Sequence, residues 1–292
     1  MKPLVIYHAN CWDGFCAAWV AQKALGEIEA VPAQYGTPPP DVQGRQVFIL
    51  DFSYPRNVMV EIVGAASWVC VIDHHKTAQE ALSRLDEILA PDLTVVFDIE
   101  KSGGRLAWEY FWDWRFAHLS AEARPFTLGV RRDLAPWLVD YTEDRDLWRH
   151  ALDGTQEINA ALRSYPLSFD LWDQFEQKDP RSTFYYEGAA IRRREQQIVI
   201  DHIRHARDIE MDGHQIAVVN ATVLFSEIAG ELAKGKPFGA CYFDRSDGKR
   251  QWSLRSDGDG VDVSVIAKAH GGGGHQHAAG FEEVVERTAV SA

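Results

Sequence analysis

Three short apolar runs in the first quarter of the chain each stop at residues that could bind a metal. The runs and the polar residues that follow them are 4–7 with His8, 47–50 with Asp51, and 69–72 with Asp73, His74 and His75. Imidazoles and carboxylates that converge without a thiolate framework suit a hard or borderline divalent cation. The candidates are therefore Mn²⁺, Mg²⁺ and Zn²⁺.

These runs have the character of buried parallel strands, because they are short, apolar and rich in β-branched residues. Helical segments predicted at 15–25 and 55–66 alternate with them, and a further strand is predicted at 94–98. Such alternation indicates an α/β fold with a mostly parallel sheet and right-handed crossovers. Open α/β sheets place their chemistry at the carboxyl ends of the strands. If the three strands are neighbours, their polar ends meet in one crevice.

Length and charge narrow the function classes. A chain of 292 residues predicts two domains. Its net charge of −13 argues against coating long duplex nucleic acid, which requires a basic surface, but leaves short anionic substrates open. No apolar run approaches the roughly 20 residues of a membrane helix, and the four scattered cysteines indicate no disulfide framework. We expect a cytoplasmic protein without a membrane partner, and a homodimer stays open.

A second pattern begins after a long predicted helix over 183–207, which we interpret as a connector. The segment from 209 onward predicts a smaller α/β domain. Near its end, Gly271 to Gly274 precede His275, and four such residues allow backbone N–H groups to turn toward one anion. Arg255 offers a guanidinium for phosphate or carboxylate. A metal site in one domain and an anion site in the other imply an active site in the interdomain cleft.

Two further polar segments have competing interpretations. The acid-rich stretch 140–148 is either a solvated loop or part of the metal site, with Asp144 and Asp146 as rival ligands. Ser102, before Gly103 and Gly104, is as compatible with a helix N-cap as with a substrate contact.

With these motifs in hand, the chain resembles the DHH phosphoesterase superfamily carrying the C-terminal DHHA1 domain. The resemblance rests on Asp51, Asp73-His74-His75, Asp144 and the sequence from Gly271 to Gly280, in the family's order and over essentially the whole chain. It implies a DHH metal-binding catalytic domain at 1–180, a helical connector at 181–208 and a DHHA1 substrate-binding domain at 209–292.

The resemblance also implies roles for individual residues. The implied metal ligands for one or two Mn²⁺ ions, with Mg²⁺ as an alternative, are His8, Asp13, Asp51, His74 and Asp144. The implied catalytic residues are His75, near the scissile phosphate, with Asp51, which would bridge two ions, and Asp13. The implied substrate-binding residues are Arg255, Gly272, Gly273, Gly274, His275 and, with the reservation above, Ser102.

The implied activity is hydrolysis of phosphodiester bonds in short oligonucleotides or small nucleotides by a metal-activated water. A 3′-phosphatase for pAp-like nucleotides and a cyclic-dinucleotide phosphodiesterase are alternatives. One departure from the family matters: its first motif usually reads Asp-x-Asp, and here it is Cys11-Trp12-Asp13. Asn10, Cys11 or water would fill the place, or one ion would bind weakly. A nucleotide-binding regulatory protein with a degraded metal site is therefore the alternative of another class.

Overall fold

The computed structural model describes residues 2–117, 135–258 and 260–285. The chain forms two compact units, Met1–Arg192 and Arg193–Ala292. The division falls inside α10 (Tyr186–Ile203), within the segment predicted as a connector. The functions assigned to 1–180, 181–208 and 209–292, and an active site between the domains, stay predictions.

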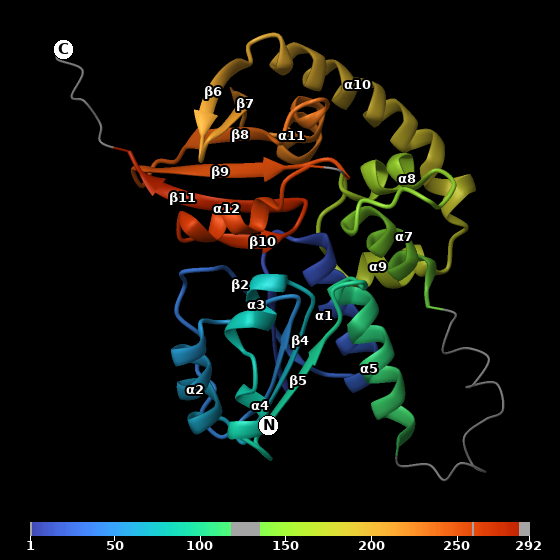
Figure 1. The fold of residues 1–292 in the computed structure, drawn as a ribbon. Helices are drawn as coiled ribbons and strands as arrows, with labels where there is room; N and C mark the ends of the chain where they lie inside the picture. Colours follow the sequence, from blue (N-terminus) through green and yellow to red (C-terminus); the bar gives the residue numbers. More distant parts are fainter. Residues whose placement is uncertain (1, 118–134, 259, 286–292) are drawn as a thin grey trace. The chain divides into compact units, whose positions relative to one another are not determined.

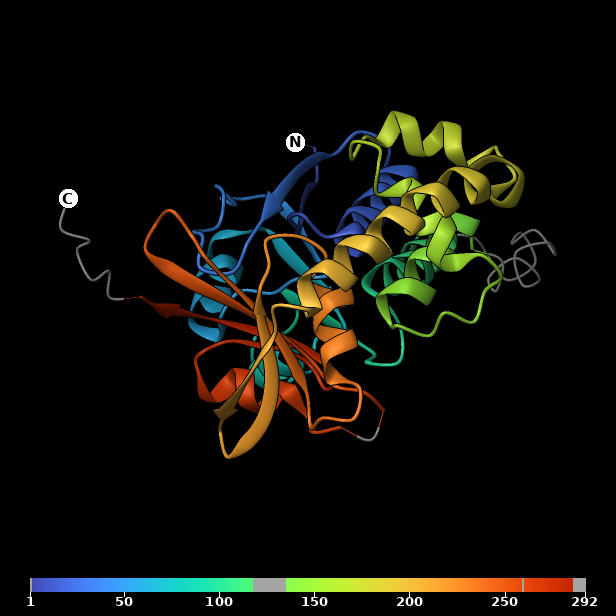
Figure 2. The same cartoon turned by 90° about the horizontal axis from the view of Figure 1, so that it is seen from above.

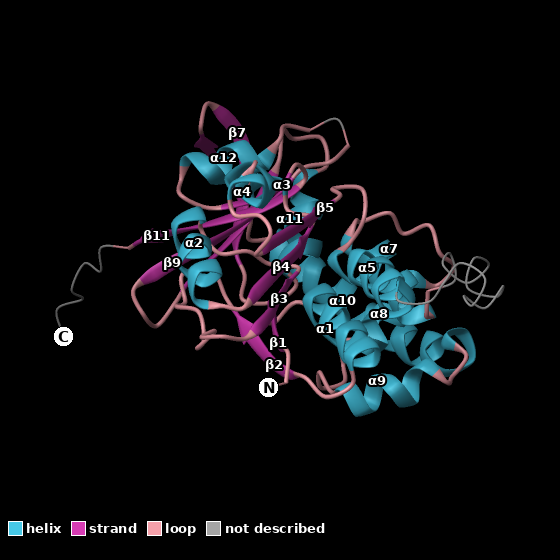
Figure 3. Cartoon of the chain, turned by 90° about the horizontal axis from the view of Figure 1, so that it is seen from below, coloured by secondary structure: helices cyan, strands magenta, loops and turns pink. Residues whose placement is uncertain are grey.

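The first unit is built on a five-stranded sheet whose pairings are all parallel. In spatial order its strands are β2 (Glu29–Ala33), β1 (Leu4–His8), β3 (Gln46–Leu50), β4 (Trp68–Asp73) and β5 (Leu93–Phe97). Figure 3 shows this order directly. The three strands predicted to carry the chemistry, β1, β3 and β4, are adjacent, so the expectation that they are neighbours is confirmed.

Helices cover both faces of this sheet because its residues are apolar on both sides. Val5, Phe48 and Ile72 belong to the core cluster that packs against α1 and α5. Ile6 and Val71 belong to the opposite cluster, which packs against α2, α3 and α4 (Figure 1). The helices of the unit are α1 (Trp12–Leu25), α2 (Arg56–Ala65), α3 (Lys76–Ala81), α4 (Leu85–Ile88), α5 (Gly103–Ala117), α7 (Trp137–Asp146), α8 (Thr155–Leu162), α9 (Phe169–Glu176) and the π-helical turn η1 (Arg181–Tyr185).

Strand β2 is an element that the sequence did not predict. It contains Pro32, which lacks a backbone N–H and is therefore tolerated mainly in edge strands. The structure places β2 at the edge of the sheet, where it pairs with β1. Its half-exposed side chains gave no clear alternation from which a strand could be recognised.

The second unit is a six-stranded mixed sheet flanked by helices, which agrees with the smaller α/β domain predicted from 209 onward. Strands β6 and β10 were not predicted. In spatial order its strands are β10 (Gly273–His275), β11 (Ala278–Val284), β9 (Lys249–Arg255), β8 (Gly239–Asp244), β7 (His214–Asn220) and β6 (Arg207–Met211). Helix α11 (Phe225–Ala233) packs on one face and α12 (Val263–Ala269) on the other (Figures 1 and 2).

The helices of the described residues are short or polar by the standard of a membrane span. None of them is both long and apolar enough to cross a membrane.

Two helical glycines give a test of how tightly the first unit is packed. A Cβ at Gly14, in α1, would lie 2.6 Å from the backbone oxygen of His8, whereas a Cβ at Gly64, in α2, would meet nothing within 4 Å. We expect Gly14→Ala to lower the free energy of unfolding by about 1–3 kcal/mol because the backbone must shift. Gly64→Ala should instead leave it unchanged or raise it by up to about 1 kcal/mol. Urea unfolding of both variants is the measurement, and equal effects would contradict the close packing of α1 on β1.

Candidate functional site

Polar residues gather at the carboxyl edge of the parallel sheet. His8 is the last residue of β1, Asp51 follows β3 directly, and His74 follows β4. The strand order reverses between β1 and β3, and open α/β sheets form their binding crevice at such a reversal. The predicted convergence of these strand ends is therefore observed.

Asp51 lies at the centre of this group. Its Oδ1 is 3.1 Å from Nε2 of His74, and its Oδ2 is 3.6 Å from Nδ1 of His8. Oδ2 also accepts a hydrogen bond from the Cys11 thiol at 3.3 Å. The side chain is 1% exposed, and its backbone has a φ of 53°, in the left-handed region that a non-glycine residue seldom adopts. The chain thus turns sharply at the end of β3 to aim this carboxylate along the sheet edge.

Asp13 is held by the first turn of another helix. The backbone N–H groups of Gly103 and Gly104, which begin α5, donate to its Oδ2 and Oδ1 at 2.5 and 2.9 Å. A Cβ on Gly103 would lie 2.6 Å from Cβ of Asp51, so glycine is required for the helix to approach this closely. The Oδ2 of Asp13 is 3.6 Å from Nε2 of His74. Asp13 therefore lies in the site, as predicted, with α5 as its support.

The two rival carboxylates of α7 have different surroundings. Both oxygens of Asp144 accept backbone N–H groups, from Ala151 at 2.9 Å and Leu152 at 3.1 Å. Asp146 instead places its Oδ2 at 3.5 Å from Nε2 of His74. The carboxylate of Asp144 thus fixes the following loop, whereas that of Asp146 lies in the group around His74. Which of the two binds a metal stays a prediction, and this geometry favours Asp146.

Asp73 has a role that the sequence analysis did not assign. Its Oδ1 accepts the backbone N–H groups of His74 and His75 and lies 2.7 Å from Nδ1 of His75. A carboxylate on one ring nitrogen fixes the orientation of an imidazole. Asp73 therefore orients the ring of His75. The spacing itself, an acid immediately before two histidines, was the available signal.

Electrostatics at this site favour a cation. Burial, and then the neighbouring carboxylates of Asp51 and Asp146, raise the pKa of Asp13 well above its usual value. Burial likewise raises the pKa of Asp146, with Asp51 adding to the effect. Burial opposes a charge on His74, but its contact with Asp51 and the carboxylates of Asp146 and Asp13 raise its pKa to about 10. The carboxylates thus raise one another's pKa values, and a bound cation would stabilise their charged forms.

The donor set fits a divalent metal. The ligand atoms of Asp13, Asp51 and His74 lie within 4.8 Å of one another, and so do those of His8, Cys11 and Asp51. His8 Nδ1 has no hydrogen-bond partner among the described residues, and its separation from Asp51 Oδ2 is too long for a hydrogen bond. Two ligands of one ion can stand at that separation, because each is only about 2.0–2.2 Å from the metal.

Ser102 caps the N-terminus of α5, which is one of the two roles predicted for it. Its side chain is fully buried, and its Oγ accepts the N–H of Arg105 at 3.2 Å in the first turn of α5. The substrate contact suggested for Ser102 is not the role that this geometry gives it.

The glycine run of the second unit is a tight connection into a hairpin. The N–H groups of Gly271 and Gly272 donate to the carbonyls of Lys268 and Ala267 at the end of α12. They are therefore already used, which corrects the prediction that all four glycines turn their N–H groups toward an anion, and removes Gly272 as a donor. A Cβ on Gly274 would lie 2.5 Å from the oxygen of Ala278, so glycine is needed for β10 to pack on β11.

The predicted phosphate clamp has a partial counterpart within this unit. His275 pairs with Ala278, which pairs in turn with Arg255 on β9. Residues directly opposite in a sheet share a face, so the side chains of His275 and Arg255 start from the same face of the sheet. Arg255 also donates to Ser226 Oγ at 2.7 Å, which holds its guanidinium. Substrate binding by Arg255, Gly273, Gly274 and His275 stays a prediction.

Exposed side chains near the carboxylates were also missed. The Tyr35 ring is 5.6 Å from the His8 ring between centroids, and the residue is 55% exposed. Trp148, two residues after Asp146, is 44% exposed with a φ of 54°. Neither residue follows a periodic pattern, because each lies outside the helices and strands, so the sequence offered no signal beyond its type.

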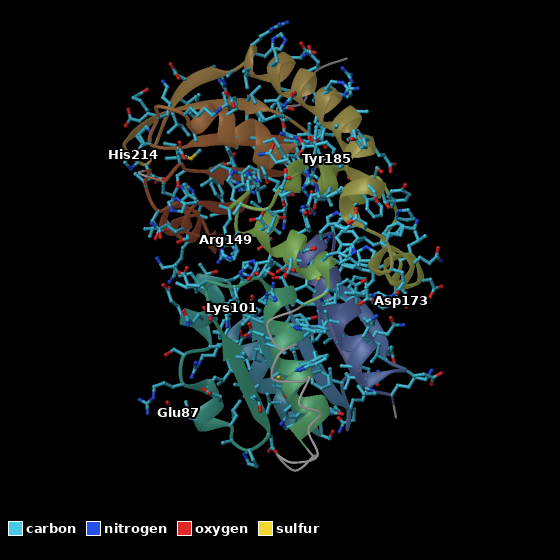
Figure 4. The ribbon with its side chains drawn as sticks, turned by 90° about the vertical axis from the view of Figure 1, so that its right-hand side faces the viewer. Glu87, Lys101, Arg149, Asp173, Tyr185 and His214 are labelled. Carbon is cyan, nitrogen blue, oxygen red and sulfur yellow. The ribbon has the colours of Figure 1, made fainter. Side chains whose placement is uncertain are left out.

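Two cations of the first unit, Lys101 and Arg149, lie close to the loop before α5. Figure 4 labels Lys101 and Arg149, which lie far from Glu87 at the opposite end of the unit. Arg149 donates to the backbone oxygen of Glu100, and Lys101 pairs with Glu109 at 2.8 Å. These cations partly offset the acidic charge of the unit.

Two relatives match most of the chain in comparisons with known proteins. No protein-family model matches the chain. The chain is 28% identical over 95% of its length to the uncharacterized protein R106 of Acanthamoeba polyphaga mimivirus, and 28% identical over 94% of its length to oligoribonuclease NrnB of Bacillus subtilis strain 168. It spans 66% and 71% of the lengths of these relatives.

A solved structure of a DHH domain, from a protein described as a member of a family of ribosomal proteins, shares the fold. Its TM-score is 0.55 at 16% identity, and the match covers 97% of this chain and 83% of that one. The predicted α/β fold is confirmed by the two sheets and by this likeness.

The exchange of Asp146 for Asp144 can be tested by metal binding. Asp146→Asn should weaken Mn²⁺ binding at least tenfold, because it removes a carboxylate beside His74. Asp144→Asn should leave metal affinity near that of the wild type but lower the free energy of unfolding by about 1–3 kcal/mol, because a buried N–H loses its acceptor. Calorimetric titration with Mn²⁺ and urea unfolding in chelator measure the two effects. Weaker Mn²⁺ binding in Asp144→Asn, with unchanged binding in Asp146→Asn, would instead identify Asp144 as the ligand.

Proposed function

We propose that this chain is a member of the DHH phosphoesterase superfamily and a metal-dependent phosphodiesterase that hydrolyses short oligonucleotides or small nucleotides. The observation that carries the proposal is the convergence of Asp13, Asp51, His74 and Asp146 at the carboxyl edge of the sheet. Manganese is the proposed ion.

The proposed chemistry divides between the ion and the chain. A bound divalent ion would lower the pKa of a water molecule and offset charge on the phosphoryl oxygens. Asp13, Asp51, His74 and Asp146 would hold it. Because α5 and the turn after β3 fix the first two carboxylates, the chain need not reorganise these ligands when substrate binds.

His75 is the proposed acid or orienting group for the substrate. Asp73 holds its Nδ1, which assigns any proton transfer to the leaving oxygen to the other ring nitrogen, Nε2. Burial disfavours a charged imidazole, but Asp73 raises the pKa of His75 above its usual value. A higher pKa keeps more of the ring protonated near neutral pH, as donation to a leaving oxygen requires.

Nucleotides are the proposed substrates for three reasons. The Bacillus relative is named an oligoribonuclease. Exposed aromatic rings of the first unit, Tyr35 beside His8 and Trp148 beyond Asp146, are suited to stack on bases. The net charge of −13 favours short substrates over long strands.

A nucleotide 3′-phosphatase is a second candidate. Arg255 and His275 begin from the same face of one sheet, and such a pair suits a second phosphate group on a pAp-like nucleotide. The two candidates differ in the bond that is cut, so a substrate panel separates them.

The deciding experiment is hydrolysis of a panel by metal-stripped protein supplied with Mn²⁺. The panel contains a di- to pentanucleotide RNA ladder, pAp, cyclic dinucleotides and pyrophosphate. We expect turnover of the short RNAs, and a loss of at least a hundredfold in Asp51→Ala and His74→Ala because each removes a central ligand.

Other results change the assignment. Preference for pAp would support the phosphatase. Nucleotide binding without turnover of any member, with Mn²⁺ shown to be bound, would favour the regulatory alternative.

The stacking role of Tyr35 can be tested separately. Tyr35→Ala should raise KM for a trinucleotide about tenfold, because base stacking contributes about 1–3 kcal/mol. Tyr35→Phe should keep a KM near the wild type, since the ring is retained. Tyr186→Ala, which removes a 77% exposed ring on α10, is the matched surface control. An unchanged KM in Tyr35→Ala would exclude stacking by this ring, and an equal rise for pyrophosphate would show a general disturbance of the site.

A further inference from the structure

Cys11 is the residue by which this chain departs from the family pattern, and its surroundings are unlike those of the other cysteines. Cys16, Cys70 and Cys241 are buried in the apolar cores. Cys11 is partly exposed and lies in the turn between β1 and α1, where its side chain caps no helical N–H. It contacts the carboxylate of Asp51 instead.

The thiol shares its position with two other donors. The ligand atoms of His8, Cys11 and Asp51 lie within 4.8 Å of one another. Sγ of Cys11 is 3.3 Å and Nδ1 of His8 is 3.6 Å from the same oxygen, Oδ2 of Asp51. Nδ1 of His8 has no hydrogen-bond partner among the described residues. Nitrogen, sulfur and oxygen donors therefore meet at one point.

The neighbouring group differs in its chemistry. Asp13, Asp51 and His74 offer oxygen and nitrogen alone. Carboxylate-rich sets suit manganese and magnesium, whereas a thiolate with an imidazole and a carboxylate suits zinc and other thiophilic ions. The two groups share Asp51 but would select different metals.

We infer that Cys11 is a thiolate ligand of a divalent ion held with His8 and Asp51, and that it makes this position selective for zinc over manganese or magnesium. The inference rests on the proposed function, because both require a divalent ion at the carboxyl edge of this sheet. On binding, the S–H bond breaks, the sulfur electron pair forms the bond to the metal, and the proton passes to solvent. No redox change is involved.

A simple packing role would make a different prediction. If the thiol merely donated a hydrogen bond to Asp51, serine would replace it and no sulfur would contact a bound ion. The test must therefore report on the metal–sulfur bond itself and not on activity alone.

Cobalt absorption provides that report, because a thiolate bound to Co²⁺ gives a charge-transfer band in the near ultraviolet. We would titrate Co²⁺ into the metal-stripped full chain. The expected result is a saturable band that Zn²⁺ abolishes by displacement. The band should be absent in Cys11→Ser and retained in Cys241→Ala, which removes a buried thiol of the second unit.

Selectivity is measured by competition between metals. Cys11→Asp restores the carboxylate of the family pattern, so the ratio of Zn²⁺ to Mn²⁺ affinity should fall at least tenfold. Thermal unfolding in chelator should match the wild type for Cys11→Ser. Cys11→Asp places a carboxylate beside Asp51, so it should unfold at a lower temperature in chelator and regain stability when Mn²⁺ is added, which shows that both variants fold.

The outcomes separate this inference from the proposed function. Bound Co²⁺ without the band, a band unchanged in Cys11→Ser, or an unchanged affinity ratio in Cys11→Asp would overturn the thiolate ligand while leaving the phosphodiesterase proposal intact. Failure of the wild type to bind Co²⁺, Zn²⁺ or Mn²⁺ would overturn both.

Discussion

Repulsion among buried carboxylates is the constraint on which the first unit depends. Asp13 and Asp51 are each 1% exposed, and Asp146 lies near the same imidazole. Burying charges of one sign is costly unless hydrogen bonds or opposite charges offset them. Here the N–H groups of α5 support Asp13, and His74 lies between the carboxylates. The raised pKa values of Asp13 and Asp146 show the cost that remains, which protonation or a bound cation would relieve, so the site and the stability of the unit are linked.

The backbone around the site is built to bring these charges together. Asp51 adopts a left-handed conformation, and Gly103 allows α5 to approach within contact of both Asp13 and Asp51. Backbone conformations of this kind cost energy and persist where function requires them. The parallel sheet makes the arrangement rigid, because β1, β3 and β4 are covered on both faces and present their carboxyl ends at one edge. Rigid strands and one tightly packed helix thus position ligands from distant parts of the sequence.

The sequence predicted the parts of this arrangement that local pattern determines. The apolar runs that stop at His8, Asp51 and Asp73 can be recognised from the sequence. The alternation of strands and helices, which indicates a parallel sheet, can be recognised in the same way. The sequence could not distinguish Asp144 from Asp146. The difference depends on which carboxylate accepts the N–H groups of residues 151 and 152 after the chain turns. The glycine run was predicted to bind an anion because the sequence does not show where its N–H groups point. In the folded chain the N–H groups of Gly271 and Gly272 donate to carbonyls at the end of α12.

Asp51 divides its two oxygens between the two ligand groups. Oδ1 faces His74, and Oδ2 faces both Cys11 and His8. A carboxylate that uses one oxygen for each of two ions couples their binding, because the first ion orients the side chain for the second while also repelling it. Whether orientation or repulsion dominates depends on the negative charge of the ligands around the second ion. A thiolate at position 11 would add a charge there that a serine or a water molecule would not. As the thiolate ligand inferred above, Cys11 would therefore supply the charge of the carboxylate that the family pattern has at this position, on a softer donor atom.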